Sequence, residues 1–186
     1  MVVLGQGSFL RRWCKDRRAV AAVEFALMLP FLLGLYLGAF EAEECTSVYR
    51  KVSTTTYELA NISSQYTAMS NTDLSNVFNA TSQVMTPYPT SNLAVLLTEV
   101  VTDKSGNATV VQSCPFQGAT PLAKGAPVSL PTGMTQPSTY YILVQSSYVY
   151  STVTTIGASI FPNVTLTDQV VMLPRQSASI ALPTTC

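Results

Sequence analysis

The most apolar part of the sequence runs from Val20 to Phe40, and Glu24 is its one charged residue. A helix of these 21 residues would be about 30 Å long, which matches the hydrocarbon core of a bilayer. We therefore predict that residues 19–40 form a transmembrane helix. Pro30 lies inside this segment, where membrane helices tolerate a proline kink.

The sequence after this segment keeps a helical pattern. Neither glycine nor proline occurs between Phe40 and Met69. Apolar residues recur there at three- and four-residue steps, with one seven-residue gap: Cys45, Val48, Val52, Leu59, Ile62 and Tyr66. This spacing predicts that the helix continues to about Met69.

A second, shorter helix is predicted over residues 71–84. Ser70 or Asn71 can cap its start, and Asp73 lies in its first turn. Its predicted apolar face consists of Leu74, Val77, Phe78 and Thr81. The helix is expected to end before Pro87, because the residue before a proline is driven out of the helical region.

From residue 93 the pattern changes to short runs of β-branched and aromatic residues. Strands are predicted near 93–101, 108–113, 140–153 and 164–173, with a hairpin turn at 105–107. The proline- and glycine-rich segment 114–138 is expected to be an irregular loop. The fold class is therefore α+β: a long N-terminal transmembrane helix continues into a soluble domain with a second short helix and a small antiparallel sheet of about four strands.

Charge predicts the orientation of this helix. Residues 1–18 carry five bases and one acid, a balance of +4, whereas the balance from Val20 onward is −4. Basic residues beside an apolar segment stay in the cytoplasm. We therefore expect residues 1–18 to be a cytoplasmic leader and residues 41–186 to form one exported domain. No basic patch indicates nucleic-acid binding.

The four cysteines allow more than one pairing. Cys14 lies on the cytoplasmic side, whereas Cys45, Cys114 and Cys186 lie on the exported side. In an oxidising compartment Cys114 and Cys186 are the natural pair, and Cys45 would stay unpaired. A bond from Cys45 to either of the others remains an alternative.

The sequence offers little for catalysis. It contains no histidine, so the usual general base and the commonest metal ligand are missing. The acids of the exported part are isolated along the chain: Glu58, Asp73, Glu99, Asp103 and Asp168. We expect neither an enzyme nor a bound cofactor, although a membrane-anchored hydrolase remains a remote rival.

Glu24 is the unusual residue. A carboxylate inside a membrane span costs about 2.5–3.5 kcal/mol on insertion scales. Glu24 either reaches the nearby cytoplasmic interface or pairs with a positive charge from a neighbouring helix. The residue alone does not decide between these two interpretations.

The segment RRAVAAVEFALMLPFLLGLYLGAFE resembles the N-terminal part of the TadE-like minor pseudopilins of the bacterial tight-adherence (Flp) pilus system. The shared pattern is a basic leader, small residues, Glu-Phe, and an apolar run that opens with Leu-Pro. The most specific part is VEFALMLP. The resemblance extends over most of residues 17–178.

The resemblance implies cleavage by a prepilin peptidase between Ala19 and Val20. Glu24 and Phe25 would then be the fifth and sixth residues of the mature chain. The new α-ammonium group at Val20 could pair with the Glu24 carboxylate of an adjacent subunit and fix their register. Ala19 stands where the commonest pilin pattern has glycine, so an uncleaved chain remains an alternative.

The resemblance also implies a role and partners. The chain is expected to act in pilus assembly and adhesion at the bacterial inner membrane, with a periplasmic domain that can also become extracellular in the pilus. Its partners would be other minor pseudopilins, the major pilin, the inner-membrane assembly platform and a prepilin peptidase. The alternative is an uncleaved, membrane-anchored adhesion module of the periplasm or surface. Gly34 and Gly38 form a GxxxG step that is either ordinary membrane glycine or, with Pro30, part of a helix contact.

Overall fold

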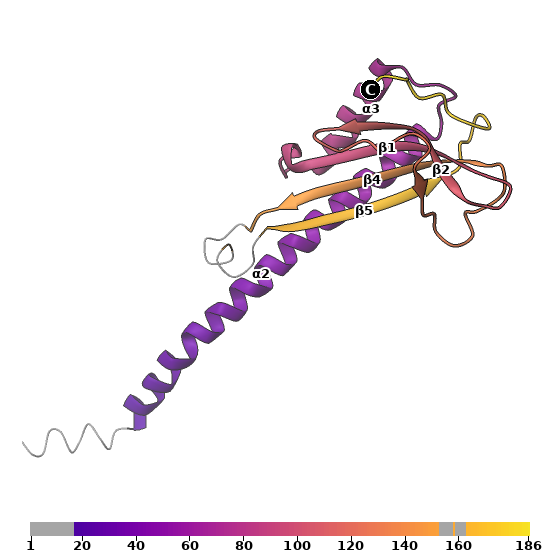
Figure 1. Ribbon diagram of the computed structural model, residues 1–186. Helices are drawn as coiled ribbons and strands as arrows, with labels where there is room; N and C mark the ends of the chain where they lie inside the picture. Colours follow the sequence, from indigo (N-terminus) through magenta and orange to yellow (C-terminus); the bar gives the residue numbers. More distant parts are fainter. Residues whose placement is uncertain (1–16, 153–157, 159–162) are drawn as a thin grey trace, which may run out of the picture. The chain divides into compact units, whose positions relative to one another are not determined.

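The computed structural model describes residues 17–152, 158 and 163–186 (Figure 1). The chain divides into two compact units, one up to Glu43 and one from Glu44 to Cys186. Residues 1–16 of the predicted leader, and the last residue of the predicted strand 140–153, lie outside the described residues.

Helix α2, Arg17–Ser63, is the longest element of the chain. It continues through Pro30 and forms the described part of the first unit. Its residues from Glu44 to Ser63 belong to the second unit, where one face is buried and the opposite face is exposed. The predicted amphipathic pattern of this half is therefore present.

The predicted end of this helix near Met69 is wrong, because α2 ends at Ser63. The backbone amides of Gln65 and Tyr66 donate to carbonyls three residues earlier, which tightens the last turn. The Met69 amide then donates to the carbonyl of Ala181, 2.9 Å away. Backbone pairing with a segment more than 100 residues later replaces the helical bonds that local propensity favours.

Helix α3, Asn71–Ser82, begins as the sequence predicts and is followed by a 3₁₀ turn, η1, at Gln83–Met85. The Ser70 hydroxyl accepts from the Asp73 amide at 3.2 Å, and the Asp73 carboxylate accepts from the Ser70 amide at 2.9 Å. This reciprocal capping box satisfies two amides of the first turn. The four residues of the predicted apolar face are buried.

The second unit contains one antiparallel sheet with the order β3-β2-β1-β4-β5. A 3₁₀ turn, η2 at Thr90–Asn92, leads into it. The strands are β1 Leu93–Thr102, β2 Ala108–Phe116, β3 Pro127–Val128, β4 Tyr140–Tyr150 and β5 Val164–Met172. The α+β prediction is confirmed, although the sheet has five strands rather than four.

The difference lies in the segment 114–138, which the sequence predicts to be a loop. Strand β2 extends to Phe116, and the short strand β3 pairs with its beginning. Pro115 can occupy β2 because it lies opposite Leu96, whose backbone groups point toward β4 and not toward β2. Its missing amide hydrogen therefore costs no bond with β1.

The two faces of the sheet are covered differently. One hydrophobic cluster joins α2 and α3 to the sheet face that carries Leu93, Val95 and Leu97. A smaller cluster on the other face joins sheet residues to Val128 and Leu130. The main core therefore lies between the two helices and the sheet, with α2 and α3 behind the strands in Figure 1.

The hairpin turn between β1 and β2 forms as predicted. The Asp103 carboxylate accepts from the amides of Ser105 at 2.7 Å and Asn107 at 2.8 Å. Gly106 has a φ of +83°, and a Cβ atom on it would lie 2.9 Å from the Thr135 carbonyl oxygen. Both the backbone conformation and the close approach therefore require glycine here.

Candidate functional site

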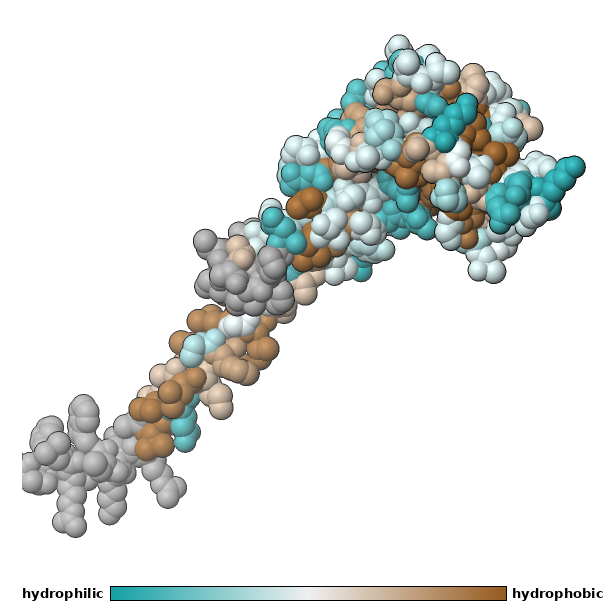
Figure 2. All heavy atoms as spheres, in the orientation of Figure 1, coloured by the Kyte–Doolittle hydropathy of each residue, from teal (hydrophilic) through white to brown (hydrophobic). Residues whose placement is uncertain are grey.

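The first candidate site is the apolar segment of α2. Every residue from Val20 to Tyr36 is exposed, and Leu27 and Phe31 expose 72% and 70% of their surface. Figure 2 shows apolar residues over most of the visible surface of this segment. Among the described residues, α2 is the one helix that is long and apolar enough to cross a membrane, which is consistent with a single-pass membrane anchor.

Glu24 lies one helical turn after Val20 on this exposed segment. Both side chains are exposed, and Glu24 forms no ion pair with the side chains that the structure describes, which begin at Val20. Phe25, beside it, exposes 62% of its surface. The side chain of Ala19 lies outside the described residues, so processing between Ala19 and Val20 stays a prediction.

The two glycines of the GxxxG step lie on the same helix. A Cβ atom added at Gly34 or Gly38 would meet nothing within 4 Å. The chain itself therefore gives no steric reason for glycine at either position. A role of these residues and of Pro30 in helix packing stays a prediction.

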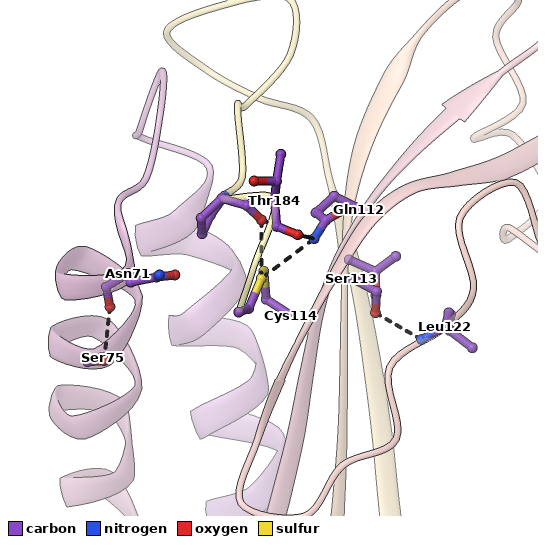
Figure 3. The surroundings of a disulfide bond; sticks show 10 residues. Asn71, Ser75, Gln112, Ser113, Cys114, Leu122 and Thr184 are labelled. Carbon is purple, nitrogen blue, oxygen red and sulfur yellow. Dashed lines mark hydrogen bonds between the residues drawn. A yellow bond between two sulfur atoms is a disulfide. The ribbon is translucent and has the colours of Figure 1, made fainter.

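The second candidate site is the C-terminal segment from Pro174 to Cys186, which we call the C-terminal strap. A disulfide joins Cys186 to Cys114 on β2, with their Cα atoms 5.2 Å apart. Beside it the Gln112 side chain donates to the carbonyls of Pro183 at 3.0 Å and Thr184 at 3.3 Å (Figure 3). The predicted disulfide is confirmed, and Cys45 is the free cysteine among the described residues.

The strap also contributes apolar contacts. Ile180 is fully buried, and Leu182 exposes 9% of its surface; both belong to the main core. The Arg175 amide donates to the carbonyl of Ser64 at 2.8 Å, just after the end of α2. The strap therefore ties the end of α2 to the sheet by hydrogen bonds, apolar packing and a covalent bond.

Glu99, one of the isolated acids of the exported part, is buried. It lies on β1 with 4% of its surface exposed, and its carboxylate accepts from the Ile180 amide of the strap at 2.9 Å. Burial raises the pKa of Glu99, and the bond from Ile180 opposes this shift. Strand alternation is the signal that could have found it, because Val95, Leu97 and Glu99 occupy alternate positions on the face that the helices cover.

The described residues contain no group of three or more histidine, cysteine, aspartate or glutamate side chains that could hold a metal ion. The predicted absence of enzyme activity and of a cofactor stays a prediction. Comparisons of the chain with models of protein families, with curated proteins and with solved structures give no match.

We expect Cys114→Ser to release the strap. The disulfide spans 72 positions of sequence, and its loss should lower the free energy of unfolding by about 4 kcal/mol in the chain-entropy model. Thiol titration of the denatured, unreduced chain should find one more free thiol in the variant, that of Cys186. Cys45→Ser is the control, because it removes a thiol that is already free. One thiol fewer in Cys114→Ser would mean that the bond does not form.

Glu99 should make the stability of the domain depend on pH. Since the pKa of its folded state lies above the ordinary value of 4.5, its contribution is complete below that value and is lost as pH rises through the raised pKa. Glu99→Gln keeps an acceptor for Ile180 but cannot ionise. The stability of Glu99→Gln relative to the wild type, measured by urea unfolding, should therefore increase as pH rises from below 4.5 through the raised pKa. Glu58→Gln on α2 is the control for removing a charge; an identical pH dependence of wild type and Glu99→Gln would contradict this account.

Proposed function

We propose that the chain is a TadE-like minor pseudopilin that acts in assembly of a tight-adherence pilus. In this proposal the apolar segment of α2 anchors the chain in the bacterial inner membrane and packs against helices of other subunits. The partners are other minor pseudopilins, the major pilin and the inner-membrane assembly platform. The observation that carries the proposal is an exposed apolar segment of α2, residues 20–36, whose one acid, Glu24, forms no ion pair with a side chain that the structure describes.

The energetics of the exposed segment support an anchor. Burying apolar surface is worth about 25 cal/mol per Å², so the exposed leucine and phenylalanine side chains favour lipid or another helix over water. Between helices in lipid the apolar surface gives little preference for one register over another. A single carboxylate in such a segment can supply that preference when a neighbour brings a positive charge.

The distribution of charge supports the orientation. The leader carries a balance of +4, and the residues from Val20 onward carry −4. By the positive-inside rule the N-terminus would lie in the cytoplasm and the second unit in the periplasm. The Cys114–Cys186 disulfide agrees with that assignment, because structural disulfides persist in oxidising compartments.

The rival function is an uncleaved, permanently anchored adhesion module that never enters a pilus. The N-terminus of the mature protein separates the two. We expect the mass of the membrane-extracted protein to correspond to a chain that begins at Val20, because a peptidase cut after Ala19 creates the α-ammonium group that would pair with Glu24. An intact leader in cells that possess the prepilin peptidase would favour the rival.

Glu24→Ala tests the role of the carboxylate. We expect the variant to insert into the membrane at the wild-type level, because alanine is less costly in lipid than glutamate. Piliation should be lost, since removing one partner of a buried ion pair costs about 3–5 kcal/mol at each contact. Electron microscopy would count the pili and membrane fractionation would measure insertion. Glu43→Ala removes an exposed acid of the same helix and should leave piliation unchanged. Normal pili in Glu24→Ala would exclude the register role.

A further inference from the structure

The two edges of the sheet differ in a way that indicates a binding surface. At one edge β3 has two residues, one of them Pro127, and it pairs with only the start of β2. At the other edge β5 has nine residues and pairs with β4 without a register shift. Natural sheets usually protect an edge with short strands, charged side chains, proline or a bulge. Strand β5 has neither proline nor a bulge, and its charged residues are limited to Asp168.

The hydrogen-bond pattern shows which backbone groups of β5 point away from the sheet. The Thr102 amide donates to the Thr139 carbonyl at 3.0 Å, so the even-numbered residues of β1 direct their backbone groups toward β4. These residues pair with the odd-numbered residues of β4, so the even-numbered residues of β4 direct their backbone groups toward β5. Their partners, the even-numbered residues of β5, therefore point toward β4. The outward groups of β5 therefore belong to its odd-numbered residues: Thr165, Thr167, Gln169 and Val171.

A side-chain contact agrees with this assignment. The Gln169 amide donates to the carboxylate of Asp168 at 2.9 Å, as an amide outside the ladder can. No described residue outside the sheet forms a backbone hydrogen bond with the outward groups of β5. The edge thus offers a row of amides and carbonyls in strand geometry, and Asp168 covers one of these amides.

We propose that the outer edge of β5 binds an extended strand of another protein, antiparallel to β5, with a lysine or arginine opposite Asp168. Main-chain hydrogen bonds would supply the binding, and side chains of the added strand would supply the selectivity. Asp168 is the one charged residue of β5. A basic side chain opposite it would attract the carboxylate and release the Gln169 amide for the new ladder.

A second copy of this chain fits the edge less well. Antiparallel pairing of two β5 strands over their full length would place Asp168 opposite Asp168, where like charges are unfavourable.

The test uses the full chain in detergent micelles and hydrogen exchange of single amides. The probe is a blocked peptide of nine residues, the length of β5, in which valine and threonine alternate and a lysine replaces the central valine. At ten times its dissociation constant it should slow exchange of the Thr167, Gln169 and Val171 amides about tenfold. A matched peptide with glutamate at the centre should bind at least about threefold more weakly.

Two variants locate the binding. Thr167→Pro removes an outward amide but no bond to β4, so it should abolish the protection, whereas Thr167→Ser should retain it. Asp168→Asn should retain binding and lose the discrimination between the two peptides. Unchanged exchange of the three amides with the lysine peptide, or equal protection in Thr167→Pro, would overturn the proposal. Outward amides that already exchange slowly without peptide would also overturn the proposal. If this protection depended on protein concentration, the edge would bind a second copy. If it did not, the chain itself would cover the edge.

Discussion

The fold depends on one helix that has to satisfy two different environments. An α-helix forms its backbone hydrogen bonds within the same segment, so the main chain of α2 has the same requirements in lipid and in water. Its side chains do not. The segment of residues 20–36 is exposed and apolar apart from Glu24, and the second half of α2 buries Val48, Val52 and Leu59 against the sheet. The apolar half therefore needs a lipid or protein partner that the described chain does not provide, whereas the second half finds its partner within the chain.

The position where α2 stops is set by contacts distant in sequence. The strap pairs with the residues after Ser63, places Ile180 in the core, and bonds to Glu99 and Cys114 on neighbouring strands. All of these contacts order the same segment, so the entropy lost when the strap becomes ordered is offset by several contacts together. The disulfide lowers this cost further by restricting the unfolded chain. The strap is thus a structural element, although it contains no long helix or strand of its own.

Features that depend on neighbouring residues could be predicted from the sequence. The capping box of Ser70 and Asp73, the turn at Gly106 and the strand character of β4 and β5 are all local. The end of α2 and the strand β3 could not be predicted, because each depends on backbone pairing with a segment whose position only the fold determines. Glu99 was missed for the same reason: strand alternation places it on the buried face, but its partner is a backbone amide 81 residues later.

The candidate sites separate into two kinds of contact. The apolar segment of α2 offers a large surface whose attraction has no preferred direction, and Glu24 is its one polar marker. The edge of β5 offers directional hydrogen bonds at fixed spacing along the strand and little apolar area. A non-directional contact can be strong and still allow several arrangements, whereas a strand ladder permits few registers because a shift of one residue exchanges the two faces. A protein that assembled through both surfaces would therefore gain affinity from the helix and register from Glu24 and the strand edge.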